Sequence, residues 1–400
     1  MQTTQLIDTD TFYIGCNDNR LALFENIYPI EKGVSYNSYL VLDEKTVLLD
    51  TCDKTVSEQF FTNLRSVLKQ RSLDYIIINH MEPDHSALLG ELLLYYPNIQ
   101  IVCNAKTQQM IEQFFHFDAP LSYHLVKEGD TLSTGTHTFQ FVMAPMIHWP
   151  EVMVTYDTST KILYSADAFG SFGILDGFLY ADQLDLEKDW LDEARRYYTN
   201  IVGKYGTPVQ TLLKKASGLE IKKICPLHGP IWCENLSYLL DKYTLWSTYT
   251  PETKGVLLIY GSIYGHTESA VNHLAFQLAQ EGVKEISLYD ASKTHSSFLV
   301  AEAFKYPVWV IASSTYNAGI FPPVENVLLD FKAHQLQKRK VAVIQNGSWV
   351  PASGKLMQEI LSSLKEVEFI GDIFTIKSDL QPYQTADFDA FAKQIATALG

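Results

Sequence analysis

Four side chains of the metal-ligand type fall within six residues, directly after an apolar stretch with the character of a buried strand. The chain reads YIII followed by NHMEPDH, which supplies His80, Glu82, Asp84 and His85. The i, i+2 spacing of the first three predicts that their side chains lie on one side of an extended segment. Taken alone, Asp84 or His85 has an equally good interpretation as a cap of the next helix.

Three further polar residues follow apolar, strand-like stretches later in the chain. His148 follows FVMAP in the context MIHWPE, Asp167 follows KILY in YSADAFG, and His228 follows KKIC in PLHGP. Each of these residues taken singly fits a structural role. Because strand ends hold their backbones firmly, four strand ends that all carry imidazole or carboxylate groups favour one shared metal site.

A second group of residues suits the binding of a phosphate. The segment GSIYGHTE at 261–268 joins a strand to a helix, and Ser262, Tyr264 and Thr267 offer hydroxyl groups beside the backbone N–H groups of the helix start. The segment has neither the G-K-[ST] of a P-loop nor the G-x-G-x-x-G of a dinucleotide site. The alternative for this loop alone is a plain turn with Thr267 capping the helix.

Two more loops of the same half support a flavin rather than a plain turn. An apolar strand at 307–312 is followed by SSTYNAGIFP, and another at 339–345 is followed by NGSW. Both loops present a flat aromatic side chain among small polar residues, as stacking on an isoalloxazine ring requires.

The first half of the chain reads as sheets covered by helices. Residues 38–51 predict a hairpin, 56–70 a helix, 86–96 and 108–115 further helices, and 99–103, 137–144, 151–156 and 161–165 strands. Residues 187–217 read as helical with interruptions at Gly206 and Pro208, and a helix at 235–246 precedes the segment YTPETKG. This order indicates a layered α/β arrangement, and we place a domain boundary at 251–253, giving domains 1–250 and 254–400.

Beyond that boundary the pattern becomes a regular alternation of strands and helices. Strands are expected at 255–260, 284–289, 307–312, 339–345 and 367–376, and helices at 267–281, 297–304, 323–333, 353–363 and 385–398. Such alternation predicts a doubly wound parallel sheet, in which ligands bind at the carboxyl ends of the strands.

Composition excludes several classes of protein. The 400 residues are 46% apolar and 19% charged, which is incompatible with wholesale disorder. The 46 acidic residues exceed the 31 basic ones by 15, and no Lys/Arg cluster offsets them, so a nucleic-acid partner is not expected. The five cysteines form no C-x-x-C pair, which argues against a built-in rubredoxin or zinc ribbon and for a reducing compartment. We expect a cytoplasmic protein without a signal peptide and without a membrane-spanning helix.

The metal-type residues resemble those of one known family. The H-x-E-x-D-H cluster, a later histidine, an aspartate in a D-x-F context and a histidine before glycine resemble the metallo-β-lactamase fold as the flavodiiron proteins (A-type flavoproteins) use it. The resemblance covers nearly the whole chain and implies an N-terminal αββα sandwich. Hydrolases of this fold carry a motif similar to H-x-H-x-D-H and bind zinc, whereas in this chain Glu82 stands at the position of the second histidine. A carboxylate at that position suits iron better than zinc.

The resemblance implies a role for each metal-type residue. His80, Glu82 and His148 would hold one iron, Asp84, His85 and His228 the other, and Asp167 would bridge them. A family histidine at the position of His85 can move off the metal. Trp149 and Tyr197 would shape the pocket, although aromatic residues at such places also serve as core.

The three loops of the second half together resemble the FMN site of flavodoxin. The first loop is similar to S-x-T-G-x-T with Tyr264 in place of a threonine, and the second is similar to T-Y-x-x-G. The third reads Q-N-G-S-W where G-S-x-G-W is common, which leaves open which aromatic residue covers the ring. The FMN-binding residues implied by the resemblance are Ser262, Ile263, Tyr264, Gly265, His266, Thr267, Ser314, Thr315, Tyr316, Asn317, Ala318, Gly319, Asn346, Gly347, Ser348 and Trp349.

These resemblances imply a flavodiiron oxidoreductase that reduces O2 to water, NO to N2O, or both, with FMN and two non-haem irons as cofactors. They also imply a separate rubredoxin or flavoprotein reductase as electron donor, and a head-to-tail homodimer that can pair further into a dimer of dimers. One alternative is a zinc hydrolase fused to a flavodoxin-like module. Another is a flavin electron carrier whose first domain is only a scaffold.

Overall fold

The chain forms two compact units in the computed structural model, which describes residues 2–117 and 119–400. The first unit comprises the residues up to Tyr198 together with Thr207–Tyr243, and the second comprises Thr199–Gly206 with Thr244–Gly400. The predicted limits at 250 and 254 concern independently folding domains and stay a prediction.

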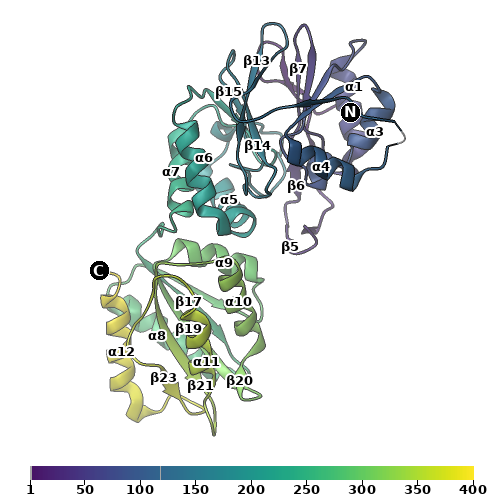
Figure 1. Cartoon of the computed structure of the whole chain (residues 1–400). Coiled ribbons are helices and arrows are strands. Elements are labelled where there is room, and N and C mark those ends of the chain that lie inside the picture. Colours follow the sequence, from purple (N-terminus) through teal and green to yellow (C-terminus); the bar gives the residue numbers. More distant parts are fainter. Residues whose placement is uncertain (1, 118) are drawn as a thin grey trace. The chain divides into compact units, whose positions relative to one another are not determined.

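Two sheets form the centre of the first unit (Figure 1). The first sheet has the strand order β1 (Gln5–Leu6), β2 (Thr11–Tyr13), β7 (Tyr39–Leu42), β8 (Thr46–Leu49), β9 (Tyr75–Ile77), β10 (Gln100–Cys103) and β11 (Tyr123–Leu125). The second has the order β12 (Thr131–Ser133), β13 (Thr138–Met143), β14 (Met153–Asp157), β15 (Ile162–Tyr164) and β16 (Lys223–Cys225). Strands β8 to β11 pair in parallel, as do β15 and β16.

Apolar side chains from both sheets form one buried core. Alternate residues of β7 and β8, such as Val41 and Leu49, pack with Phe139, Phe141 and Met153 of the second sheet. This period-two pattern places these residues on one face of each sheet, and the packing of the two faces against each other closes the sandwich. The alternate residues Leu40 and Leu48 are apolar and buried as well, so the first sheet has a second apolar face.

Helices cover the outer faces of the sandwich. Helices α1 (Ser57–Leu68), α3 (Leu89–Tyr95) and α4 (Ala105–Phe114) lie beside the first sheet in Figure 1, and α6 (Gly206–Ala216) and α7 (Leu236–Ser247) lie beside the second. The remaining helical pieces of this unit are α2 (Pro83–Ser86), α5 (Leu191–Tyr197), η1 (Lys54–Val56), η2 (Ala181–Gln183) and η3 (Leu186–Trp190), whereas η4 (Tyr198–Val202) and η5 (Gly203–Tyr205) fall almost wholly in the second unit. Two small ribbons, β3 (Cys16–Asp18) with β6 (Val34–Tyr36) and β4 (Leu23–Phe24) with β5 (Tyr28–Pro29), complete the unit.

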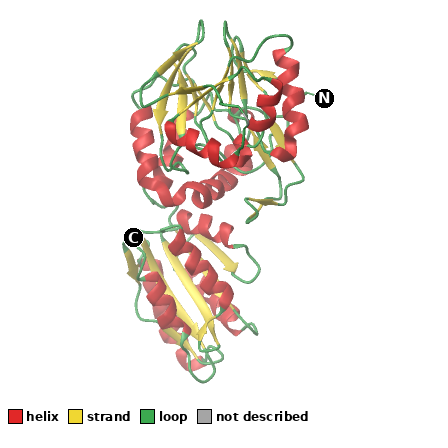
Figure 2. Ribbon diagram, turned by 45° about the vertical axis from the view of Figure 1, so that its right-hand side comes forward, coloured by secondary structure: helices red, strands yellow, loops and turns green. Residues whose placement is uncertain are grey.

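The second unit is a parallel sheet between two layers of helices (Figure 2). The strand order is β18 (Glu285–Asp290), β17 (Gly255–Gly261), β19 (Val308–Tyr316), β21 (Arg339–Asn346) and β22 (Val367–Phe369), with β20 (Gly319–Ile320) and β23 (Phe374–Ile376) added to β19 and β21. The helices are α8 (His266–Gln280), α9 (Ser296–Lys305), α10 (Pro322–Ala333), α11 (Ser353–Leu361) and α12 (Thr385–Thr397), and η6 (Pro382–Gln384) precedes α12.

The predicted fold class is therefore confirmed, with differences in detail. The strand expected at 367–376 is interrupted, because Gly371 at φ 63° turns the chain between β22 and β23. The interruptions expected at Gly206 and Pro208 fall instead before α6, in the π and 3-10 turns at 198–205, and Pro208 sits in the first turn of α6, where the ring is tolerated.

Candidate functional site

The seven metal-type residues follow strands of both sheets of the first unit. His80, Glu82, Asp84 and His85 follow β9 of the first sheet, and the other three lie in loops after β13, β15 and β16 of the second. The structure places them in two groups, the first consisting of His80, Glu82, His148 and Asp167 and the second of Asp84, His85 and His228.

The i, i+2 spacing predicted an extended segment after β9, but the segment turns helical after Glu82. Pro83 takes the first position of α2, and Glu82 precedes it with φ −57° and ψ 139°. The fixed φ of proline suits a helix start, so the chain turns helical at that point. As a result Asp84 and His85 lie on a helical turn and join a different group from His80 and Glu82.

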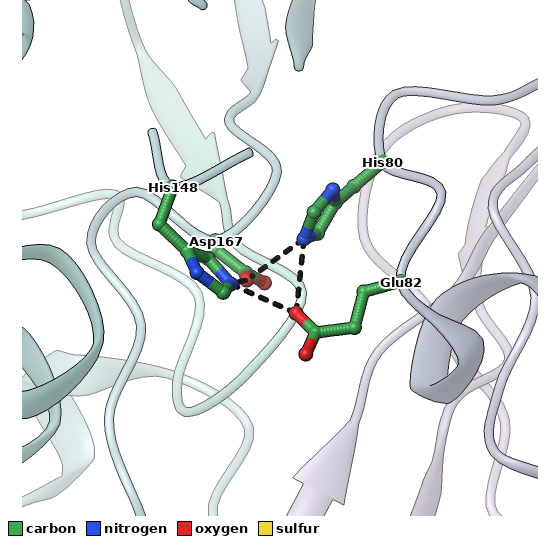
Figure 3. A group of neighbouring side chains, drawn as sticks. All are labelled: His80, Glu82, His148 and Asp167. Carbon is green, nitrogen blue, oxygen red and sulfur yellow. Dashed lines mark hydrogen bonds and ion pairs between the residues drawn. The ribbon is translucent and has the colours of Figure 1, made fainter. Parts of the chain in front are cut away.

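In the first group, carboxylate and imidazole atoms converge on one position (Figure 3). Oε2 of Glu82 lies 2.8 Å from Nε2 of His148 and 3.2 Å from Nε2 of His80. Oδ2 of Asp167 lies 3.2 and 3.4 Å from the same two nitrogens. Two imidazoles and two carboxylates thus face a common centre.

In the second group, Oδ2 of Asp84 lies 3.3 Å from Nε2 of both His85 and His228. The other carboxylate oxygen of Asp167, Oδ1, lies 3.2 Å from His85 Nε2 and 3.7 Å from His228 Nε2. Asp167 therefore directs one oxygen to each group, which is the geometry of a bridging ligand.

The side chains present fit a pair of metal ions. Both carboxylate oxygens of Asp84 and Oδ1 of Asp167 are buried without a hydrogen-bond partner among the described residues. The Nε2 atoms of His85 and His228 face each other at 3.0 Å, a contact that two neutral imidazoles make only if one of them donates. Three carboxylates among four imidazoles make a hard, anionic donor set, which suits iron better than thiolate or all-histidine sites do.

The electrostatics of the site favour bound cations. Burial alone lowers the pKa of His148, but hydrogen bonds and charges from Asp167 and Glu82 outweigh burial and raise it to about 9. Burial alone raises the pKa of Glu82 and of Asp167, and the neighbouring imidazoles outweigh it and hold both well below their usual range. Glu82 and Asp167 are therefore ionised at neutral pH, and a metal ion would take the place of the protons on the imidazoles.

Residues that the sequence analysis missed hold the ligand-type side chains in place. Asp50 accepts hydrogen bonds from the backbone N–H and side-chain amide of Asn79, at 2.8 Å each, and so fixes the turn that carries His80. Glu151 Oε1 lies 2.8 Å from Nδ1 of His80. The only available signal in the sequence is that Glu151 stands three residues after His148, in MIHWPE.

The two aromatic residues expected at the pocket lie against the imidazoles. The ring of Trp149 is perpendicular to that of His80 with centroids 5.5 Å apart, and the ring of Tyr197 lies 5.4 Å from that of His228. Tyr197 is buried, and Trp149 is half-buried. Both side chains therefore line the candidate site.

The three flavin-type loops of the second unit meet at one side chain. They follow β17, β19 and β21, which are adjacent parallel strands. The hydroxyl of Thr267 lies 3.0 Å from that of Ser314 and accepts a hydrogen bond of 3.2 Å from the side-chain amide of Asn346. The first loop ends at Gly265, whose φ of 91° favours glycine, and α8 begins at the next residue.

This arrangement fits a flavin phosphate and ring. The first N–H groups of α8 have no acceptor within the helix, and Ser262 and Thr267 add hydroxyl groups beside them. Three aromatic side chains near these loops are exposed, Tyr264 by 90%, Trp349 by 84% and Tyr316 by 45%. Exposed aromatic side chains at a sheet edge offer flat apolar surface to a planar ring.

The second loop differs from its predicted form. Residues 313–316 continue β19, and Asn317 and Ala318, both at positive φ, form a tight turn to β20. A two-residue turn with positive φ matches the twist of paired strands, which explains the hairpin. Thr315 accepts hydrogen bonds from the backbone at the start of α11 and so positions the third loop.

Two family descriptions match the chain. Residues 34–229 match the ODP family of beta lactamases, and residues 258–391 match flavodoxin. A similar protein is the anaerobic nitric oxide reductase flavorubredoxin of Vibrio vulnificus, with 30% identity over 353 residues, which cover 86% of this chain and 69% of that protein.

Solved structures are similar over the whole chain. The rubredoxin oxygen:oxidoreductase from Desulfovibrio gigas has a TM-score of 0.92 and 27% identity, over 99% of this chain and 98% of that one. The flavodiiron protein from Giardia intestinalis has a TM-score of 0.93 over 99% and 97% of the two chains, and at 22% identity it shows the fold alone.

Within the described residues, every helix is too short or too polar to cross a lipid bilayer.

Proposed function

Because this chain belongs to the flavodiiron proteins, we propose that it is an oxidoreductase that reduces O2 to water, NO to N2O, or both, with electrons supplied through FMN to two non-haem irons. One observation carries this proposal, namely that Asp167 directs a separate oxygen to each of two ligand groups. One relative is named a nitric oxide reductase, and one similar structure is named an oxygen oxidoreductase. We therefore keep both NO and O2 as proposed substrates.

The first group, His80, Glu82 and His148, would hold one iron, and the second, Asp84, His85 and His228, the other, with Asp167 shared. Bound iron would bind the diatomic gas and transfer electrons to it. The residues of the chain hold this chemistry away from water, since His80, His85 and His228 are fully buried. Such enclosure limits the escape of partly reduced products.

In the second unit, Ser262, Thr267 and the start of α8 would bind the FMN phosphate, and the hairpin and third loop would hold the ring. Bound FMN would accept electrons from a donor protein and pass them on singly. Tyr264, Tyr316 and Trp349 would provide the surfaces on which the ring stacks.

A zinc hydrolase fused to a flavodoxin-like module is the rival function, and Glu82 argues against it. The test is metal and flavin analysis of protein produced without added zinc. We expect about two irons and one FMN per chain, as the two ligand groups and three loops require. Full zinc with little iron would contradict the proposal, and protein with FMN but no metal would favour a flavin electron carrier.

The preferred gas is decided by kinetics. Protein reduced anaerobically is mixed with O2 and with NO in a stopped-flow instrument, and reoxidation of the flavin is followed by its absorbance. Rapid reoxidation by at least one gas is expected.

The donor we propose is a separate rubredoxin or flavoprotein reductase, in keeping with the naming of the relatives. The five free cysteines support a reducing, cytoplasmic location.

We also propose a head-to-tail homodimer, in which the FMN of one chain serves the irons of the other. A mixture of a chain without iron (His228→Ala) and a chain with a disrupted 262–267 loop should regain activity, although each homodimer is inactive. The flavin of the first chain and the irons of the second make one competent pair. Heterodimers that carry both intact cofactors and still consume neither gas would contradict this assembly.

A further inference from the structure

The carboxylate of Glu151 is buried directly behind a ligand-type histidine. Its side chain is fully buried, and Oε1 accepts hydrogen bonds from Nδ1 of His80 at 2.8 Å and from the backbone N–H of Met81 at 2.9 Å. Oε2 has no hydrogen-bond partner among the described residues. A buried anion is costly unless it is paired and hydrogen-bonded, and here the pairing depends on His80.

The fold fixes Glu151 independently of any metal. Its carbonyl accepts a hydrogen bond of 2.6 Å from the side-chain amide of Asn104, which also caps α4. Val152 and Met153 continue the chain into β14, and the backbone N–H of Met153 donates to the carbonyl of Asn79 at 3.1 Å. Thus the segment of Glu151 is tied to the turn that carries His80.

Within the described residues, the two histidines of the second group have no carboxylate on Nδ1. His228 donates from Nδ1 to the backbone carbonyl of Ser35 at 2.7 Å, which is a neutral acceptor. Nδ1 of His85 is buried without a partner in the part of the chain that the structure describes. The two metal positions therefore differ in the charge that stands behind their imidazoles.

We propose that Glu151 is a positioning residue that holds the proton of His80 on Nδ1, directs Nε2 toward Glu82 and Asp167, and makes this position the tighter of the two iron sites. The inference rests on the proposed function, in which His80 binds iron. A carboxylate behind a metal-bound imidazole fixes its orientation and raises its basicity, and losing such a partner costs about 10–100-fold in metal affinity or activity.

The test compares Glu151→Gln and Glu151→Ala with the wild-type holoprotein. Gln keeps an acceptor for His80 Nδ1 and removes the charge, whereas Ala removes both. Iron release from the reduced protein to a ferrous chelator is followed as two kinetic phases. His148→Ala marks the phase that belongs to the first group, because it removes a side chain from that group alone.

We expect Glu151→Ala to accelerate release in the marked phase by about 10–100-fold and to leave the other phase unchanged, with a smaller effect for Glu151→Gln. Asp157→Asn is the matched control, since Asp157 is a buried carboxylate that pairs with His137, a histidine of neither group. It should lower thermal stability and leave both phases unchanged. The control also shows what loss of a buried carboxylate–histidine pair does to stability alone.

Three outcomes would overturn the inference. They are wild-type release rates in well-folded Glu151 variants, equal acceleration of both phases, and a failure of Glu151→Gln to fold while Asp157→Asn folds. The last would mean that the charge serves stability rather than the metal. If instead the wild-type protein binds no iron at all, the proposed function fails, so the two failures are distinguishable.

Discussion

The two candidate sites are built in opposite ways. The metal-type side chains of the first unit are 0–12% exposed and come from loops of two sheets that pack against each other. The flavin-type loops of the second unit follow neighbouring strands of one parallel sheet and leave aromatic side chains up to 90% exposed.

The two sites therefore differ in what the loss of one side chain costs. A buried group of charges needs every partner, because an uncompensated charge in the interior is expensive. Exposed side chains of the flavin loops share no such requirement, since water replaces a lost partner. We therefore expect substitutions of the buried metal-type residues to have all-or-none effects and those of exposed side chains in the flavin loops to have graded ones.

The largest effect is expected from Asp167→Ala. Loss of the shared carboxylate should reduce iron content and lower gas consumption by more than about 100-fold, since even a partner behind a ligand costs 10–100-fold. FMN should remain bound, because it belongs to the other compact unit. Iron analysis, flavin absorbance and gas-electrode rates measure this. Asp176→Ala, at an exposed aspartate of the same unit, should change none of them.

Release of flavin from Asp167→Ala would show that the two sites are not independent. It would remove the contrast between the units.

A graded effect is expected from Ser262→Ala. Removing one hydroxyl from a phosphate site costs the energy of a hydrogen bond to a charged group, so FMN affinity should fall by about 10–100-fold. Fluorescence titration of the apoprotein with FMN measures it, and iron content should not change. Ser269→Ala, at an exposed serine in the first turn of α8, is the matched control. Equal losses in both variants would contradict the assignment of the first loop.

The smallest effect concerns a polar cluster in the first unit that lies outside both metal groups. His137 donates from Nδ1 to Asp157 at 2.6 Å and from Nε2 to Asp10 at 2.8 Å, which requires a protonated ring. Burial alone lowers the pKa of His137, but these two carboxylates outweigh burial and raise it to about 9 from its usual value of 6.5.

Because the folded-state pKa exceeds the unfolded one, the stabilisation is complete below pH 6.5 and is lost as the pH rises through about 9. After a discount for the partly exposed Asp10, we expect the free energy of unfolding to fall by about 1–2 kcal/mol between these pH values. Calorimetry should show this in the transition of the first unit and not in that of the second. His137→Gln should abolish the pH dependence, and an unchanged pH profile in that variant would contradict the role of His137.

Much of both sites could be predicted from the sequence, for a local reason. A strand of Val, Ile and Leu followed by polar residues marks a strand end, and in parallel sheets adjacent strand ends meet. This logic predicted Asp167 and His228 as members of one site, and Thr267, Ser314 and Asn346 as members of another. The structure brings together each of these sets.

Local sequence patterns did not divide the ligand-type residues between the two metal positions; the family resemblance implied that division, and only the tertiary structure gives its physical cause. Spacing predicted one extended row, whereas the turn into α2 separates Glu82 from Asp84, and the packing of two sheets brings His148 and His228 to different sides of Asp167. The contact of Glu151 with His80 was not predicted either, because it joins residues 71 positions apart in the chain. Residue types and the ends of strands can be read from neighbouring residues in the sequence. Which distant side chains come into contact depends on how the buried faces pack, and local patterns do not encode that packing.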